Sequence, residues 1–197
     1  MIRTARLLLR PWTLDDIEVA LEMYGTREVS RWLAPAMERV STVAMHEHVL
    51  GWMTEDDSID PCQRRWVIEL LGSGEVVGGA WLLPLPPADL DLQVGWWLAS
   101  KVWGRGFAAE AGHAVAHHAF GEGLDELFAV VPPGNANGAA TARRIGMEWV
   151  GTTEKYYNVS LEVYRLRKGD LDMAPGGVVR FSREEPIRVS SWRSARR

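Results

Sequence analysis

Two glycines one residue apart, Gly104 and Gly106, separate an apolar run that ends at Leu98 from an alanine-rich segment that begins at Phe107. Glycines at this spacing let successive backbone N–H groups turn toward a common point. A helix that begins directly behind them adds unpaired donors and a partial positive charge. The spacing therefore predicts a cradle for a phosphate or pyrophosphate group, and with it a phosphorylated cofactor.

The glycine spacing by itself admits several interpretations. Gly104-x-Gly106-x-x-Ala109 fits the dinucleotide-binding fingerprint, with Asp125 about twenty residues further on, which would indicate a nicotinamide oxidoreductase. However, Asp125 precedes the next predicted strand instead of ending it, and the strands before the glycines come as hairpins. A Walker-type loop is excluded because no Lys-Ser/Thr pair follows Gly106. A tight turn that binds no ligand is the structural alternative.

Another interpretation is an acyl-coenzyme A site. Lys101-Val102-Trp103-Gly104-Arg105-Gly106 resembles the Gln/Arg-x-x-Gly-x-Gly/Ala pyrophosphate loop of the GNAT N-acetyltransferase superfamily. The resemblance extends over residues 3 to about 170 and is to the RimJ/RimL-like branch. Its other blocks are Arg6-Leu7-Leu8-Leu9-Arg10-Pro11 with Leu14-Asp15-Asp16, then Gln93-Val94-Gly95-Trp96-Trp97-Leu98, then Val131-Pro132-Pro133-Gly134-Asn135-Ala136-Asn137, which continues to Arg143-Arg144-Ile145-Gly146-Met147.

The resemblance implies a fold and a cofactor. The fold is α+β, with a central, mostly antiparallel sheet of about six or seven strands, flanked by about four helices. The family's fourth and fifth strands splay apart, and a bulge in the fourth leaves main chain unpaired for the pantetheine arm of acetyl-CoA. The residues expected to bind this coenzyme A thioester are Trp96, Trp97, Leu98, Lys101, Val102, Trp103, Gly104, Arg105, Gly106, Phe107, Asn135 and Arg143.

In this family catalysis relies on the main chain, which the resemblance places at Val94 and Gly95. A backbone N–H there would polarise the thioester carbonyl as a small oxyanion hole. Asn135 matches a family asparagine that contacts the cofactor or an ordered water, and it is also a favourable helix N-cap.

The chain departs from the family pattern at the groups that move protons. Gly138 stands where many branch members have Ser, Ala142 where other members have an acid tyrosine, and Gln93 where a glutamate base is common. Tyr156 is our expected proton carrier, and Tyr157, Glu69 and His113 are further candidates.

We therefore expect an acetyl-CoA-dependent N-acetyltransferase that moves an acyl group to a primary amine directly, in a ternary complex. The acceptor would be a protein N-terminus, a Lys side chain or a small-molecule or peptide amine, and residues 152–159 would border its site. Three alternatives remain open. The first is an acyl-CoA-binding module without catalysis, suggested by the missing Ser, Tyr and Glu. The second is a nicotinamide oxidoreductase, and the third is transfer of a bulkier group such as succinyl.

Hydrophobic periodicity predicts the elements that position these residues. Thr13-Leu14-Asp15-Asp16 is typical of a helix N-cap followed by first-turn acids. Gly72-Ser73-Gly74 predicts a hairpin turn between two strands. We expect strands over 5–10, 65–71, 75–83, 90–98, 127–131, 149–157 and 161–167, and helices over 13–24, 41–53, 106–120 and 137–145.

Composition indicates one globular domain. The chain has 197 residues, of which 47% are hydrophobic, and a net charge of −4 that does not suggest a nucleic-acid partner. We place an acyltransferase domain at 1–172 and a basic extension at 173–197, disordered or packed on a partner, because Pro175–Arg197 holds six arginines and two glutamates. The single Cys62 excludes an intramolecular disulfide and fits the cytoplasm.

Further expectations concern partners. No segment approaches the roughly twenty apolar residues of a membrane span. The ten tryptophans are expected in the core, around an apolar pocket or in a dimer interface. A homodimer through the C-terminal strands is plausible on this basis. His113 and His117 stand at metal-ligand spacing, but no carboxylate or cysteine joins them as in HExxH, so we expect no metal.

Overall fold

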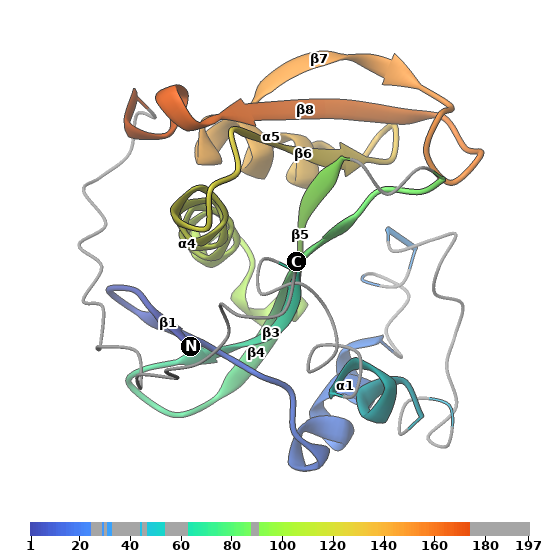
Figure 1. The fold of residues 1–197 in the computed structure, drawn as a ribbon. Coiled ribbons are helices and arrows are strands. Elements are labelled where there is room, and N and C mark those ends of the chain that lie inside the picture. The colour runs from blue at the N-terminus through green and yellow to red at the C-terminus, as the bar shows by residue number, and fades with distance from the viewer. Residues whose placement is uncertain are drawn as a thin grey trace, which may run out of the picture.

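The computed structural model describes residues 1–24, 29, 31–32, 44, 47–53, 63–87 and 91–173. Within them an eight-stranded sheet has the order β1-β2-β3-β4-β5-β6-β8-β7 (Figure 1). The expected α+β fold is confirmed, with one strand more than expected because residues 2–3 form a short hairpin with residues 8–9. The strands are β1 (Ile2–Arg3), β2 (Leu7–Arg10), β3 (Arg64–Leu70), β4 (Val76–Pro84), β5 (Leu92–Leu98), β6 (Glu126–Val131), β7 (Glu148–Thr153) and β8 (Leu161–Arg167).

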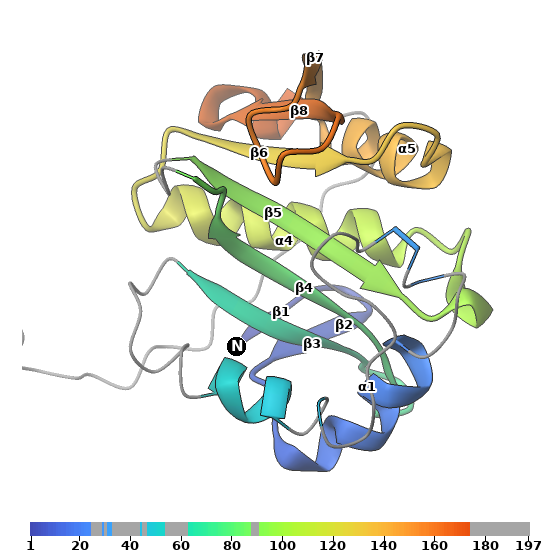
Figure 2. The same cartoon turned by 90° about the vertical axis from the view of Figure 1, so that its right-hand side faces the viewer.

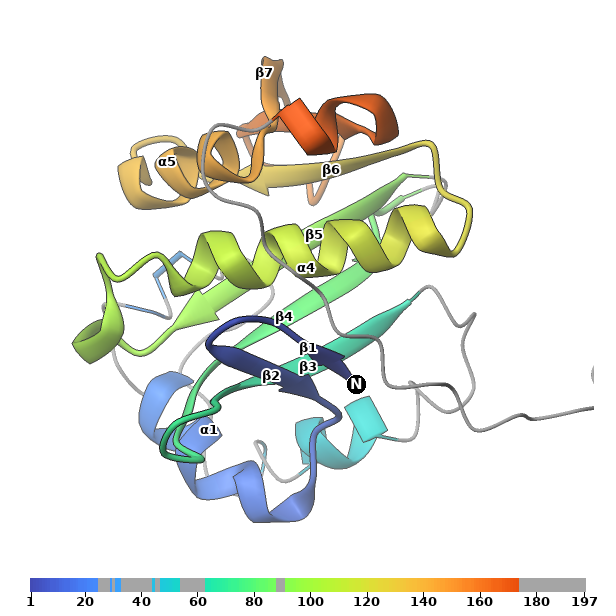
Figure 3. The same ribbon diagram turned by 90° about the vertical axis from the view of Figure 1, so that its left-hand side faces the viewer.

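The helices cover both faces of this sheet. α4 (Phe107–Gly121) crosses one face and packs against β1, β2, β4, β5 and β6 (Figure 3). α5 (Ala136–Ile145) lies beside α4, and α1 (Ile17–Tyr24) contacts β4. The expected helix over 41–53 is described at 44 and 47–53, which are helical. Short 3-10 turns stand at Leu14–Asp16, Ser100–Val102 and Lys168–Met173, while the expected basic extension lies outside the described residues from 174 onward.

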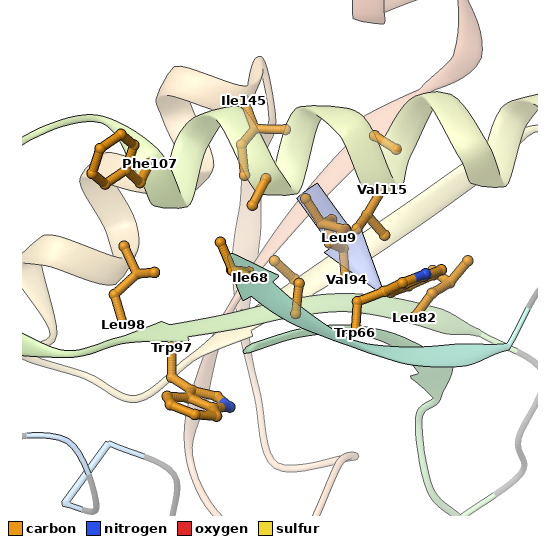
Figure 4. Packing of buried hydrophobic residues seen from close by; sticks show 14 of the residues in the cluster. Leu9, Trp66, Ile68, Leu82, Val94, Trp97, Leu98, Phe107, Val115 and Ile145 are labelled. Carbon is orange, nitrogen blue, oxygen red and sulfur yellow. The ribbon is translucent and has the colours of Figure 1, made fainter. Parts of the chain in front are cut away.

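The core covers both faces of the sheet, with one part under α4 and another on the side of α1 that includes Ala20 and Trp97. Alternate residues of β5 point to opposite faces, so Val94 and Leu98 face α4 whereas Trp97 points away from it (Figure 4). Val94 and Leu98 pack in one buried cluster with Val115 of α4 and Ile145 of α5. This packing fixes β5 against the helix that begins behind the glycine loop.

One expectation about β5 is wrong. Its pairing with β4 runs without a register shift from Gly78–Leu98 to Pro84–Leu92, so the expected bulge over 94–98 is not present. The splay itself is confirmed, because β5 pairs with β6 through a single parallel bridge, Gln93 to Phe128, and the two strands then diverge (Figure 2). Straight strands that separate are sufficient to leave main chain exposed in the gap.

The expected cap before α1 is confirmed and carries an ion pair. The Asp16 carboxylate accepts hydrogen bonds from the Thr13 backbone N–H at 2.8 Å and from two nitrogens of Arg10 at 2.8 and 2.9 Å. Burial opposes ionisation of Asp16, but the bonds from Arg10 and Thr13 outweigh it and lower its pKa. The group therefore ties β2 to the helix that follows.

We expect Asp16→Ala to lower the free energy of unfolding by about 2 kcal/mol at neutral pH, because the cap and a part-buried charge pair are lost together. The lowered pKa means that this stability is present above the unfolded-state value of 3.8 and is lost as the pH falls through the folded-state value. Urea denaturation at pH 7 and at decreasing pH below 4 checks both statements. Asp15→Ala, at the exposed neighbouring acid, is the control and should change stability by less than about 0.5 kcal/mol.

Candidate active site

A cavity of about 640 Å³ opens where β5 and β6 diverge. It is lined by Val94, Trp96 and Leu98 from the α4 face of β5 and by Gln93, Gly95 and Trp97 from the opposite face. A cavity that touches both faces of one strand must pass through the gap beside that strand. Its two ends therefore lie on opposite sides of the sheet, one near the start of α4 and the other on the side of α1.

The end near α4 is the glycine cradle predicted from the sequence. Gly104 and Gly106 have φ angles of +76° and +80°, a left-handed conformation that glycine adopts without strain. Gly106 is the N-cap of α4 and provides no side-chain cap, so the first-turn N–H groups stay available to an anion. Gly104, Gly106 and Phe107 all line the cavity. This geometry suits a pyrophosphate.

A side-chain clamp holds this cradle in place, and we call Arg6 with Glu110 the Arg6–Glu110 clamp. The Arg6 guanidinium lies 2.6 Å from the Glu110 carboxylate and donates a hydrogen bond of 3.0 Å to the carbonyl of Arg105. Thr4 donates to the same carboxylate at 2.6 Å. The clamp therefore neutralises an acidic group in the first turn of α4, where a negative charge would repel a bound phosphate.

The main chain of β5 presents alternate residues to the gap. Ala99 N–H bonds to Val77 and Leu85 N–H bonds to Asp91, so odd-numbered residues of β5 pair with β4 and even-numbered ones face β6. In the parallel bridge between Gln93 and Phe128, the main-chain groups of the even-numbered residues on either side of Gln93 bond to β6. The next residue that faces the gap is Trp96, while the Leu98 carbonyl accepts a 2.8 Å bond from the Trp103 indole.

This alternation separates the two predicted main-chain positions. The N–H of Gly95 points to β4 and belongs to the ladder, and Val94 stands next to the bridge. Trp96 N–H is the donor that the strand geometry directs into the gap. Of the predicted main-chain positions, Gly95 thus faces β4 and Val94 lies at the bridge, whereas Trp96 faces the gap.

Asn135 occupies the predicted position beside the gap. Its side-chain oxygen accepts a 2.9 Å hydrogen bond from Gly138 N–H, which makes it the N-cap of α5, and it also lines the cavity. A Cβ on Gly138 would lie 2.9 Å from Asn135 Nδ2 and 3.1 Å from a Val131 methyl group. The close packing around Asn135 explains why a serine does not fit here without a shift.

Three predicted cofactor residues lie outside the cavity lining. Lys101 pairs with Glu75 at 2.8 Å, and the Arg105 guanidinium lies 4.7 Å from the Phe107 ring centre. Arg143 lies 5.7 Å from the ring centre of Tyr164. The neighbouring Arg144 lines the cavity instead, because successive helical residues point about 100° apart. The remaining predicted cofactor residues, Trp96, Trp97, Leu98, Val102, Trp103, Gly104, Gly106, Phe107 and Asn135, all line it.

Tyr156 and Tyr157 also differ in whether they line the cavity. The Tyr156 hydroxyl donates to Asp91 at 2.8 Å, and burial together with this bond raises the pKa of Tyr156. Tyr156 does not line the cavity, but Tyr157 does, with a φ of +56°. The Tyr157 hydroxyl accepts a hydrogen bond from the Gln93 side-chain amide. The structure thus directs the second tyrosine, not the expected first one, to the gap.

The other two proton-carrier candidates lie elsewhere. Glu69 is held by Arg10 at 2.8 Å, and His113 lies on α4 with its ring centre 4.8 Å from that of His117. Neither lines the cavity. In the part of the chain that the structure describes, no three His, Cys, Asp or Glu side chains gather as a metal site would require.

The end of the cavity on the α1 side is aromatic. We call the tryptophans that line it, with His48, the tryptophan chamber. Trp12 stacks on Trp97 with ring centres 6.0 Å apart, and Trp12 contacts Trp52 at 5.3 Å. The chamber consists of Trp12, Trp32, Trp52, Trp81, Trp97 and His48. The sequence indicated a tryptophan-lined pocket but not which tryptophans form it.

Comparison with known families decides what this arrangement is. Residues 6–148 match the family described as acetyltransferase (GNAT) domain. The chain belongs to the GNAT acetyltransferase family. This membership identifies the matched domain as an acyltransferase, and the cradle beside the split strands is its expected feature.

Two relatives come from Bacillus subtilis (strain 168). The chain is 30% identical to the uncharacterized protein YkkB over 104 residues, which are 52% of this chain and 60% of YkkB. It is 25% identical to the uncharacterized N-acetyltransferase YoaA over 79% of this chain and 87% of that protein. The match to YkkB therefore spans less than two thirds of that relative.

Solved structures share the fold. A GNAT-family acetyltransferase from Bacillus anthracis superposes with a TM-score of 0.72, at 21% identity, over 85% of this chain and 98% of its own. RimJ from Mycobacterium smegmatis, solved with CoA-disulfide, gives 0.69 at 20% identity over 85% and 88%. AAC(6')-Ib, solved with ribostamycin and coenzyme A, gives 0.69 at 14% identity over 87% and 99%. The GNAT neighbours thus include proteins that hold coenzyme A.

Among the described residues, no helix is both long and apolar enough to cross a membrane.

Proposed function

We propose that this GNAT protein transfers an acetyl group from acetyl-CoA directly to a primary amine in a ternary complex. One observation carries the proposal: a single cavity passes through the gap between β5 and β6, with the glycine cradle at one end and the tryptophan chamber at the other. A donor and an acceptor that enter from opposite sides meet at the split. Holding them together there supplies a large part of the rate enhancement.

The residues at the cradle suit coenzyme A. The N–H groups that start α4 would hold the pyrophosphate, and Arg144 adds positive charge on the side of α5. The pantetheine arm would run along the exposed edge of β5, where Trp96 N–H can polarise the thioester carbonyl. Asn135, fixed by its bond to Gly138, lies beside this edge.

Tyr157 is our proposed proton carrier. Its hydroxyl accepts rather than donates the bond from Gln93, an arrangement in which a phenol can pass its own proton to the departing thiolate. The left-handed backbone at Tyr157 and Asn158, with φ of +56° and +54°, turns this side chain into the cavity. Such strained positions persist where the surrounding structure holds them.

The test combines binding and turnover. Calorimetry with acetyl-CoA, succinyl-CoA and NADH identifies the donor, and thiol release with a panel of primary amines measures transfer. We expect acetyl-CoA to bind and at least one amine to release coenzyme A well above background hydrolysis. Binding without any turnover would instead identify a silent acyl-CoA-binding module, and preference for NADH would identify an oxidoreductase.

The Arg6–Glu110 clamp gives a second test. We expect Arg6→Ala to raise the KM for acetyl-CoA about tenfold, because Glu110 is then left as an uncompensated negative charge beside the pyrophosphate. The double variant Arg6→Ala with Glu110→Gln should recover most of the loss, since both charges are gone. Steady-state kinetics at saturating amine measures this. No recovery in the double variant would show that Arg6 acts through packing alone.

Two further proposals concern the cellular location and the oligomeric state of the protein. We propose a cytoplasmic protein, from the single cysteine and the nature of the donor. We also propose a homodimer along β7, the last strand of the sheet in its described part, where the Trp149 and Val150 side chains are 53% and 41% exposed. Sedimentation of the purified protein tests the second, with Trp149→Lys expected to favour the monomer.

A further inference from the structure

We propose that the acceptor is a small arylalkylamine, a primary amine one to three carbons from a planar apolar ring. This inference rests on the proposed acetyltransferase function and concerns the tryptophan chamber alone.

Two indoles lie flat across neighbouring strands and form the floor. Gly79 pairs with Trp97 and Gly95 pairs with Trp81, so all four residues share the face of the sheet that points away from α4. The Trp97 indole lies 2.8–2.9 Å from where a Cβ on Gly79 would be, and Trp81 fills the space of a Cβ on Gly95. Each indole can lie flat only because its partner is glycine.

Aromatic side chains also form a wall. Trp12 stacks on Trp97 at an interplanar angle of 24°, and Trp52 leans against Trp12 at 59°. His48 stacks on Trp52 with ring centres 6.2 Å apart. Trp12 and Trp97 are only 5% exposed, so the half-buried Trp52 and Trp81 are the rings on which a planar acceptor can stack. An arriving ammonium group is attracted by indole faces.

A cationic side chain also contacts the chamber. The Arg65 guanidinium lies 6.0 Å from the centre of the Trp52 ring. Most of the described residues that form the chamber are aromatic, so an acceptor with a planar ring gains contacts there that an aliphatic acceptor does not.

The linker length follows from the position of the floor. The Trp81 indole lies over Gly95 of β5, and Gly95 directly precedes Trp96, whose N–H faces the gap. A ring stacked on Trp81 is therefore one strand residue, about 3.3 Å along β5, from the position of that N–H. A chain of one to three carbons is enough for the amine to reach it.

The reaction balances without any further reactant. The neutral amine nitrogen attacks the thioester carbonyl carbon, a C–N bond forms and the C–S bond breaks. The amine loses one proton and the coenzyme A thiolate gains one. The products are an N-acetylated arylalkylamine and free coenzyme A.

The experiment compares acceptors with the full-length protein and saturating acetyl-CoA. Tryptamine and phenethylamine represent the proposed class, with spermidine, kanamycin, butylamine and a short peptide as competitors. We expect kcat/KM for the arylalkylamines to exceed that of every competitor by at least about tenfold. Turnover of a competitor in preference to the arylalkylamines would overturn this inference and leave the acetyltransferase function standing. If none of these amines releases coenzyme A, both this inference and the acetyltransferase function are contradicted.

Variants of the floor test the same inference. We expect Trp81→Ala to lower kcat/KM for tryptamine about tenfold or more while the KM for acetyl-CoA changes less than about twofold. Trp81→Phe keeps a ring and should retain most of the activity, which also covers the case in which the alanine variant folds poorly. Leu14→Ala, at an exposed apolar residue outside the cavity lining, is the control. Equal losses with Trp81→Ala for tryptamine and butylamine would contradict a stacking role.

Discussion

Replacing Gly106 with valine should weaken acetyl-CoA binding on the order of 100-fold, measured as the Kd by calorimetry. Gly106 has a φ of +80°, and a β-branched residue there is strained by a few kcal/mol unless the loop changes conformation. Any such change misaligns the N–H groups at the start of α4, which would hold the pyrophosphate. The expected loss is thus one of binding geometry and not of the fold.

A matched control separates these two effects. Gly74 also has a positive φ, +70°, with open space around its Cβ position, but it lies in the turn between β3 and β4 and does not line the cavity. Gly74→Val should cost similar stability in urea denaturation and leave the Kd for acetyl-CoA within about twofold. If both variants lose binding equally, the cradle is not the donor site.

Tyr157→Phe should lower kcat by about 100-fold or more, while the KM for acetyl-CoA changes little. The substitution removes one hydroxyl, the acceptor of the bond from Gln93, and keeps the ring that lines the cavity. A proton carrier acts in the chemical step, so the rate constant measured under single-turnover conditions should fall together with kcat. The measurement is thiol release with saturating donor and amine.

The adjacent tyrosine is the natural control for this variant. Tyr156→Phe removes a hydroxyl that bonds to Asp91 and lies outside the cavity lining. It should reduce stability by about 1 kcal/mol and leave kcat within about threefold. If Tyr156→Phe proves the more damaging of the two, the assignment from the sequence was correct and the one from the structure was not.

The features that the sequence predicted well are local. The glycine cradle needs two left-handed residues and a helix behind them, all within residues 104–121. The Thr13–Asp16 capping box and the Asn135 cap each join residues three positions apart. Local backbone conformation is strongly limited by residue type at such positions, which explains why spacing alone was informative. The family resemblance then ordered these local features along the chain.

The sequence is less informative where two residues of the same type are neighbours. Arg143 and Arg144 are alike in sequence, and so are Tyr156 and Tyr157, but only one of each pair lines the cavity. Which one does depends on the rotation of α5 against β6 and on a left-handed turn at a non-glycine residue. The bulge expected in β5 was wrong for a related reason, because strand pairing is set by partners that lie far away in the sequence.

By itself the sequence determined that two left-handed glycines precede α4 and that the chain resembles an acyl-CoA enzyme, because both properties depend on short spacings. Only the tertiary structure decided what lies opposite the cradle. Trp12, Trp52, Trp81 and Trp97 come from four separate segments, and they meet because paired glycines leave room for flat indoles on one face of the sheet. Contacts of that range carry no periodic signal along the chain.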